Sequence, residues 1–196
     1  MNVIKIKQHR ILRMVLASFA LLLFALTVSI GTLNAATCSN IRAYIPDDWV
    51  DSRYTNNNDG TVTDNQTKLM WKMCTEGQTW VDDDPDTCTG YPGTQQNAWR
   101  AVLETPLSVN AQGGFAGYND WRLPTIKELR TLVAYNCYRP SINENLFPNT
   151  PAKGFWSSSP VALDNRWAWY LDFHDGSDGY VSRERAYWIR LVRTKE

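Results

Sequence analysis

The sequence predicts an α+β fold stabilised by disulfide bonds, and three observations support this class. Two segments place apolar residues at helical spacing. Several other segments have the composition and turn signals of β-strands. Four cysteines follow an N-terminal export signal, and an even number of cysteines in an exported chain predicts disulfides.

Residues 1–36 have the features of a signal peptide. Four basic residues precede an apolar run over residues 15–30, and small residues follow at Ala35 and Ala36. The apolar run is about 16 residues long, whereas a bilayer span needs roughly 20. We therefore expect cleavage near Ala35 or Ala36 and no membrane span afterwards; an uncleaved anchor is the alternative. The mature chain would be periplasmic, exposed on the outer surface or secreted.

Removal of the signal changes the charge balance. The full chain has 20 basic and 20 acidic residues, and the signal takes away four basic residues and no acidic ones. The mature chain therefore carries 16 basic and 20 acidic residues, a net charge of −4. This balance gives no reason to expect a nucleic-acid partner. The remaining chain is long enough for one domain with its own core.

All four cysteines lie in the mature chain, and they allow three pairings into two disulfides. We favour Cys74 with Cys88, which closes a short polar loop, and Cys38 with Cys137, which ties the N-terminal segment to the centre of the chain. No C-x-x-C spacing is present, which disfavours a zinc ribbon or a thioredoxin-type site.

The N-terminal half of the mature chain begins with an extended segment over residues 37–52, and we expect the domain proper to cover residues 53–196. Arg53 to Met73 is predicted to form two strands around the turn Asp59-Gly60. Within it, Leu69-Met70-Trp71 has the continuous apolar character of a buried strand. The polar stretch Thr75 to Gly93 is predicted to be a loop.

Two helices are expected next. Gln95 to Leu107 has apolar residues at helical spacing, and Pro106 should limit its end. Thr125 to Asn136 is the second helix, where Thr125 and Glu128 have the spacing of a capping box.

The C-terminal half is predicted to be β-structure with long loops. Its strands are expected at Phe155–Ser158, Arg166–Phe173 and Tyr187–Arg193. Asp175-Gly176 and Asp178-Gly179 are predicted turns.

Several stretches together resemble the bacterial Lcl C-terminal domain family over about residues 53–194. They are, in chain order, Asp59–Thr67, Trp121–Leu129, Pro140–Asn143, Phe155–Ser159, Trp167–Trp169 and Ile189–Arg193. The resemblance implies a C-type lectin-like fold, in which two helices pack on a twisted antiparallel sheet with long loops. It also implies an exported ligand-binding module, since the namesake domain belongs to a trimeric, collagen-tailed adhesin that binds sulfated glycosaminoglycans. This chain has no collagen-type segment, so a trimer is an expectation that the resemblance alone supports.

The basic C-terminal stretch is the predicted ligand site. Arg183 and Arg185 would share a face on a strand and suit sulfate or carboxylate groups, and Tyr180 and Tyr187 would contact a sugar ring. The alternative is ordinary ion pairing for the arginines and core packing for the tyrosines.

An acidic loop offers a second kind of site. Asp82, Asp83, Asp84 and Asp86 provide the oxygen ligands that calcium prefers, although a solvated acidic loop explains them equally simply. We expect no other cofactor.

Catalysis is not expected. A Ser–His site would have to use His174 with a serine such as Ser158, and no G-x-S-x-G motif surrounds that serine. The stretch from Arg122 to Glu128 also resembles formylglycine-generating oxidases, but this chain lacks a reactive-thiol environment. We therefore expect an adhesin-type domain that binds anionic polysaccharide, sulfated or rich in uronic acid. An envelope or appendage protein that docks a protein partner is the alternative, and a hydrolase or oxidase ranks below both.

Overall fold

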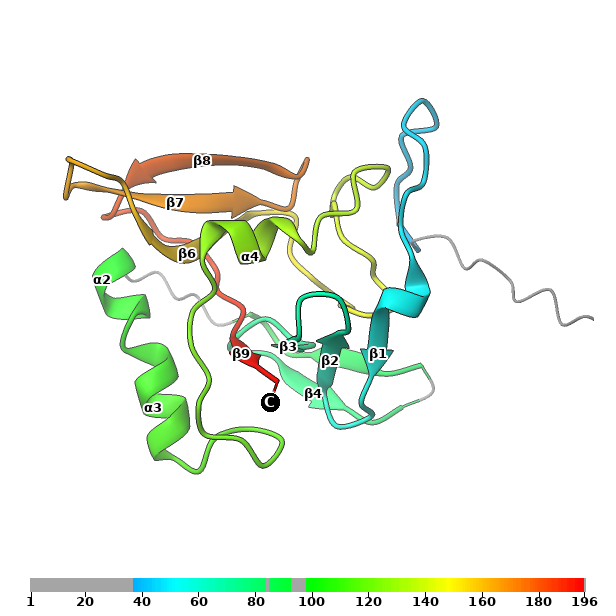
Figure 1. The fold of residues 1–196 in the computed structure, drawn as a ribbon, viewed down its shortest axis with the longest axis horizontal. Coiled ribbons are helices and arrows are strands. Elements are labelled where there is room, and N and C mark those ends of the chain that lie inside the picture. The colour runs from blue at the N-terminus through cyan, green and yellow to red at the C-terminus, as the bar shows by residue number, and fades with distance from the viewer. Residues whose placement is uncertain (1–36, 84, 93–97, 196) are drawn as a thin grey trace, which may run out of the picture. The chain divides into compact units, whose positions relative to one another are not determined.

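The computed structural model describes residues 37–83, 85–92 and 98–195. The predicted signal, residues 1–36, lies outside these ranges. The described chain forms a four-stranded sheet, a three-stranded sheet and a separate two-stranded hairpin, with short helices beside them (Figure 1). All strand pairs are antiparallel, so the α+β class is confirmed at this level.

The four-stranded sheet joins the two ends of the described chain. Its order is β1-β2-β3-β9, and its strands are β1 (Tyr54–Asn56), β2 (Thr61–Asp64), β3 (Leu69–Lys72) and β9 (Val192–Thr194). The predicted turn at Asp59-Gly60 is confirmed, because Asp59 accepts the N–H of Thr61 and Gly60 has a positive φ of 81°. A Cβ at Gly60 would lie 2.8 Å from the Phe115 ring, so both the backbone and the packing require glycine there.

Both predicted disulfides are present, Cys38–Cys137 and Cys74–Cys88. The region between Cys74 and Cys88 is more ordered than the predicted loop, because β4 (Thr79–Val81) and β5 (Thr87–Thr89) form a small hairpin. The Cys38 bond anchors the N-terminal segment, which passes into a 3-10 turn at Asp51–Arg53 immediately before β1.

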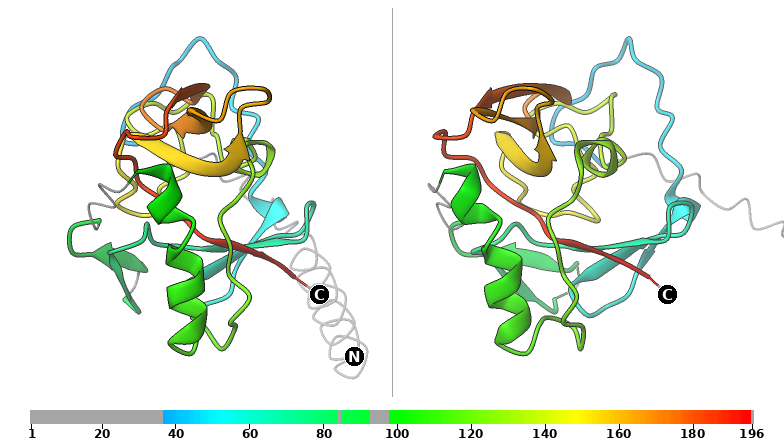
Figure 2. Two further views of the ribbon diagram at one scale, coloured as in Figure 1. Left: turned by 90° about the vertical axis from the view of Figure 1, so that its left-hand side faces the viewer. Right: turned by 60° about the vertical axis from the view of Figure 1, so that its left-hand side comes forward.

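The first predicted helix is divided. Its expected start at Gln95 lies outside the described residues, which resume at 98, and the helix appears as α2 (Trp99–Val102) and α3 (Thr105–Ala111). The expectation that Pro106 ends a helix is wrong: Pro106 lies in the first turn of α3. A first-turn position needs no backbone N–H donor, so proline is tolerated there. Figure 2 shows α2 and α3 following one another along one side of the sheets.

Helix α4 (Ile126–Arg130) confirms the predicted capping box. The Thr125 hydroxyl accepts the N–H of Glu128, and the Glu128 carboxylate accepts the N–H of Thr125 at 2.7 Å. The helix ends well before the predicted Asn136. Thr131 donates its hydroxyl to the carbonyl oxygen of Glu128 at 2.7 Å, and such side-chain bonds compete with continuation of a helix.

The three-stranded sheet comprises β6 (Gly154–Pro160), β7 (Trp167–Asp172) and β8 (Ser177–Ser182) in that order. The turn at Asp175-Gly176 is confirmed between β7 and β8. The predicted turn at Asp178-Gly179 is wrong, because both residues lie inside β8 and Gly179 pairs with Tyr170. The Tyr170 ring lies 3.4 Å from the position of a Gly179 Cβ, so a glycine in the strand leaves room for this ring.

The predicted last strand, Tyr187–Arg193, is regular β-structure only from Val192 onwards. Its earlier part links the two sheets instead. Trp188 exchanges backbone hydrogen bonds with β6, donating to Gly154 and accepting from Trp156, and Leu191 accepts the N–H of Lys72 in β3.

The core consists of two main clusters on opposite faces of the four-stranded sheet. Trp71 belongs to the first cluster, together with α4 residues such as Leu129. Met70 belongs to the second cluster, with Trp99 and Trp121. Neighbouring residues of β3 therefore face different clusters, which explains why this strand is apolar without alternation and confirms its predicted burial.

Candidate functional site

The two predicted ligand tyrosines lie on opposite faces of the three-stranded sheet. Tyr180 is 57 % exposed in β8 and contacts the edges of Trp167 and Trp169. Tyr187 packs against Trp156 and Tyr170, with ring centroids 5.0 and 4.8 Å away. The structure therefore does not bring the two tyrosines to one surface, and Tyr187 has the packing role that was the alternative.

The strand placement of Arg183 and Arg185 is wrong, because β8 ends at Ser182 and both arginines follow it in a turn. The Arg183 guanidinium lies 4.2 Å from the centroid of the Trp99 ring, and its Nε donates to the Trp167 carbonyl oxygen at 3.1 Å. Arg185 is exposed. Their role as ligand-binding residues stays a prediction.

The acidic loop is described except for Asp84. Asp82 and Asp83 are exposed, and Asp86 accepts a hydrogen bond from the Asn56 amide at 2.7 Å. Within the described ranges, no three Asp, Glu, His or Cys side chains are grouped so that they could hold a metal ion. Calcium binding here stays an untested prediction.

The stretch Asp120–Glu128 is engaged in internal contacts. Asp120 accepts a hydrogen bond from Arg193 Nε at 2.6 Å, and Arg122 donates to both carboxylate oxygens of Glu128 at 2.9 and 2.6 Å. The buried Trp121 donates its indole N–H to the carbonyl oxygens of Phe115 and Tyr118. Burial alone would raise the pKa of Glu128, but the bonds from Arg122 and Thr125 outweigh it and hold that pKa below its ordinary value. The polar groups of this stretch therefore hold the fold together.

Arg190 is also an internal residue, between the buried Ile189 and Leu191. It is fully buried over the Phe147 ring, and it donates to the Met73 carbonyl oxygen and to Thr150 Oγ1. Burial lowers its pKa to about 9, so the guanidinium stays mostly protonated at pH 7.

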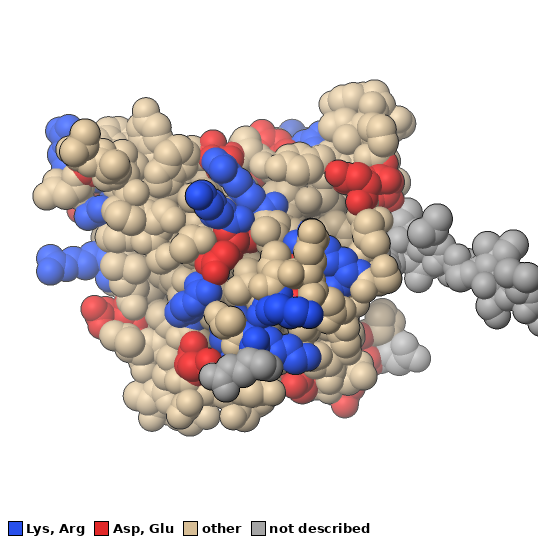
Figure 3. Space-filling model, viewed as in Figure 1, with Lys and Arg blue, Asp and Glu red and all other residues tan. Residues whose placement is uncertain are grey.

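Basic side chains gather on one face around α4 and the end of β9, with acidic side chains between them (Figure 3). The ion pairs account for this mixture: Arg122 with Glu128, Arg130 with Asp178 and Arg193 with Asp120. Alternating charges of this kind do not produce a strong field of one sign, so this face is a weak candidate for binding a polyanion.

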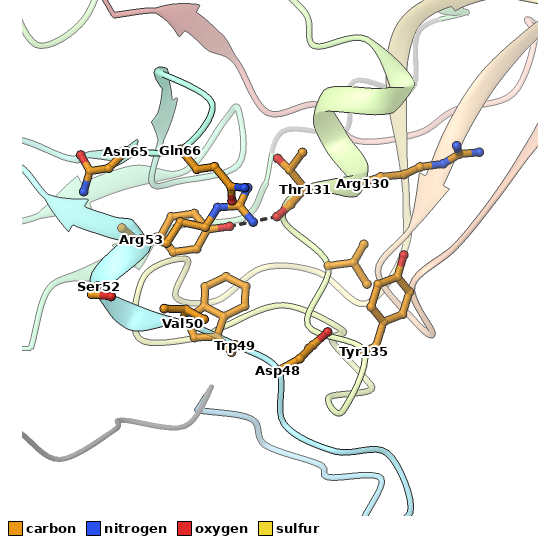
Figure 4. Close-up of a pocket in the computed structure, with 12 residues that line it drawn as sticks. Asp48, Trp49, Val50, Ser52, Arg53, Asn65, Gln66, Arg130, Thr131 and Tyr135 are labelled. Carbon is orange, nitrogen blue, oxygen red and sulfur yellow. Dashed lines mark hydrogen bonds between the residues drawn. The ribbon is translucent and has the colours of Figure 1, made fainter.

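A hollow of about 600 Å³ lies between the N-terminal segment and the end of α4, and we call it the Trp49 hollow. Trp49 stacks on Tyr54 with ring centroids 4.6 Å apart, and Tyr54 donates its hydroxyl to the Thr131 carbonyl oxygen. Figure 4 shows Arg130 extending away from this hollow, while Arg53 and Gln66 lie on one side of it. Arg53 is paired with the buried Asp64. The hollow therefore combines aromatic and amide groups with the carboxylate of Asp48 and with arginines that are already paired, which does not suit an anionic ligand.

A second hollow, of about 530 Å³, differs from the Trp49 hollow in the charge of the side chains that line it. We call it the cationic hollow. Its lining includes Tyr91, Arg139, Asn149, Lys153, His174 and Trp188. No Asp or Glu is among the described residues that line it, and none of the described carboxylates pairs with Arg139 or Lys153. Two exposed cations thus lie at one hollow without acidic partners.

The aromatic groups of the cationic hollow come from separate elements. Tyr91 follows β5 and is 73 % exposed, whereas the half-buried Trp188 is fixed by its backbone bonds to β6. The indole N–H of Trp188 is buried and has no protein partner among the described residues. An aromatic surface beside cations can bind a ring that carries anionic groups.

His174 is exposed in the turn between β7 and β8, and it accepts a hydrogen bond at Nε2 from Arg139 Nε at 2.8 Å. Ser158 instead donates its hydroxyl to the Pro124 carbonyl oxygen at 3.2 Å. No contact joins this serine to His174 in the described structure, so a Ser–His pair gains no support.

Sequence reasoning missed the cationic hollow as a site. Arg139, Lys153 and Trp188 are far apart in the sequence, and none belongs to a recognisable motif. His174 drew notice because the mature chain has no other histidine.

The fold, its internal ion pairs and its two disulfides define a small domain with open hollows on its surface. A family model described as the Lcl C-terminal domain matches residues 60–193, which is most of the chain. The chain therefore belongs to the Lcl C-terminal domain family, as the sequence resemblance indicated. No curated protein matches it. Among the described residues, no helix is long and apolar enough to cross a membrane.

Proposed function

We propose that this protein is an exported domain that binds an anionic polysaccharide, sulfated or rich in uronic acid, at the cell surface. The observation that carries the proposal is the cationic hollow, where Arg139 and Lys153 have no acidic partner and lie with Tyr91 and Trp188. Guanidinium and ammonium groups bind sulfate and carboxylate, and the aromatic side chains offer the apolar face of a sugar ring a surface.

Export is the part of the proposal that the disulfides support. Structural disulfides form and persist in oxidising compartments outside the cytosol, and this chain has two of them. The antiparallel sheets and short helices are consistent with a relative of the C-type lectin-like fold, which we include in the proposal. The proposed role is binding and adhesion, without turnover of the polysaccharide.

The test compares two basic sites in the same assay. Protein recovered after expression of the full chain is applied to immobilised heparin and to immobilised alginate, at low and moderate salt, with calcium or with a chelator. Arg139→Ala with Lys153→Ala should weaken binding by about tenfold or more, since each charge-assisted contact contributes about 1 kcal/mol or more. Arg183→Ala with Arg185→Ala is the matched control, because it removes the same number of positive charges.

Each result has a distinct meaning. Loss of binding in the first pair alone supports the cationic hollow, and loss in the second pair alone moves the site to the predicted C-terminal stretch. Loss of binding in the presence of the chelator would indicate that calcium held by the Asp82–Asp86 loop takes part in binding. An absence of binding to both probes at low salt would overturn the proposal and favour a protein partner, which a pull-down with envelope extract would then identify.

A further inference from the structure

Strand β8 is the outer strand of the three-stranded sheet. Its six residues, Ser177–Ser182, pair with β7 on one side. No other described segment forms a ladder with its second side, and Figure 1 shows β8 as the uppermost strand of its sheet. A strand in this position presents a row of backbone donors and acceptors that can pair with another strand.

The register identifies the backbone groups that point outward. Arg183 donates its N–H to the Arg166 carbonyl oxygen, which makes this a hydrogen-bonded pair. Bonded pairs alternate along an antiparallel ladder, so Val181 and Gly179 face β7 in the same way. Asp178, Tyr180 and Ser182 therefore direct their backbone groups to the open edge. The carbonyl oxygen of Ser182 also points away from β7, but it already accepts the N–H of Arg185. The open backbone groups of this edge are therefore those of Asp178 and Tyr180 and the N–H of Ser182.

The usual protections of an edge strand are missing from β8. The strand contains no lysine and no proline, and the irregularity in this sheet lies between β6 and β7. Its single charged residue, Asp178, is held by the Arg130 guanidinium of α4. Tyr180 is the large exposed side chain at the middle of the strand. The edge is thus open both to backbone pairing and to apolar contact.

We propose that β8 pairs with β8 of a second copy of this chain, antiparallel and centred on Tyr180. Outward-facing residues must pair with outward-facing residues, which places Asp178 opposite Ser182 of the other copy and Tyr180 opposite its counterpart. The two sheets then form one continuous sheet about a twofold axis. The exposed Tyr180 rings, each supported by Trp169 and Trp167, lie side by side on the same face.

Charge complementarity identifies the second copy as the occupant. The exposed Asp175 precedes β8 and the exposed Arg185 follows it, so the two ends of the edge carry opposite charges. In the register centred on Tyr180, Asp175 of each copy falls at the same end as Arg185 of the other. The two contacts are repeated by symmetry, whereas a parallel arrangement would place like charges together.

The experiment measures the dimer dissociation constant by sedimentation equilibrium, using protein recovered after expression of the full chain. The unaltered protein should be a reversible dimer. Arg185→Glu should raise the dissociation constant about tenfold, because it replaces two attractive contacts in the interface with two like-charge contacts. Asp175→Arg combined with Arg185→Glu should restore the original value. Lys68→Glu, an equal charge change at an exposed residue in the turn between β2 and β3, should have no effect.

A backbone test complements the charge tests. Ser182→Pro removes an outward N–H while leaving the bonds to β7 in place, so the monomer should fold and the dimer should weaken. Retained dimerisation in a folded Ser182→Pro protein would overturn the proposed edge. A protein that stays monomeric at every concentration, or a charge reversal that fails to restore the dimer, would overturn the pairing with a second copy.

Discussion

Two polar regions of this molecule differ in how their charges are used. The stretch Asp120–Glu128 pairs its charged side chains within the chain, through Arg193 and through the contact between Arg122 and Glu128. In the cationic hollow, Arg139 and Lys153 have no acidic partner among the described residues. The most recognisable part of the sequence therefore maintains the fold, whereas the groups that are free to bind a ligand lie in segments without a motif.

The largest expected change in stability follows from a substitution in the stretch Asp120–Glu128. Trp121→Ala should lower the free energy of unfolding by about 3–5 kcal/mol, because it empties a buried site in the core. It also removes the indole N–H donor to Phe115 and Tyr118. Urea denaturation followed by circular dichroism measures the change. A loss below about 1 kcal/mol would show that the surrounding core can collapse around the missing ring, and that the stretch is less structural than its contacts indicate.

An intermediate effect is expected at Glu128, and it should depend on pH. Glu128→Gln weakens the capping box and removes the charge partner of Arg122, so the free energy of unfolding at pH 7 should fall by about 1–2 kcal/mol. The pKa of Glu128 lies below its ordinary value of 4.5 in the folded protein. The stabilisation is therefore present above pH 4.5 and is lost as the pH falls through the folded-state pKa.

The measurement for Glu128 is a pair of urea curves for the two proteins, at pH 7 and at about pH 3. The difference in the free energy of unfolding between the original protein and Glu128→Gln should be clear at pH 7 and should be smaller at about pH 3. A gap that is the same at both values would mean that the carboxylate charge does not contribute and that shape alone explains the loss.

The smallest effect on stability is expected in the cationic hollow. Arg139→Ala and Lys153→Ala should each change the free energy of unfolding by no more than about 0.5 kcal/mol, because both side chains are exposed and neither has an ion pair in the described structure. Thermal or urea unfolding checks this. A large loss of stability in either variant would show that the altered side chain stabilises the fold, as the Asp120–Glu128 stretch does. The two regions would then not differ in how their charges are used.

The elements that the sequence predicted correctly are those with local causes. The capping box at Thr125 and Glu128 and the turn at Asp59-Gly60 depend on residues a few positions apart. The errors arose where distant contacts override local signals. Asp178-Gly179 has the composition of a turn, yet pairing with β7 and the bond from Arg130 to Asp178 hold it in a strand.

The candidate site was less predictable than the fold. Tyr180 and Tyr187 are near one another in the sequence but face opposite sides of the sheet, since β8 ends and turns between them. The cationic hollow assembles residues from the β5 end, the loop after α4, the start of β6 and the segment after β8. No spacing rule within one element can bring such residues together, so the site becomes visible with the tertiary structure.

The position of β9 has a consequence for the time course of folding. This last strand pairs with β3, and Arg193 reaches Met70 across 123 positions of the chain. A chain that emerges N-terminus first therefore cannot complete its first sheet until Val192–Thr194 have been synthesised. Contacts between such distant segments form slowly, because a long loop must close before they can stabilise anything. Termination of synthesis before β9 would thus leave β3 with an open edge and part of the core exposed.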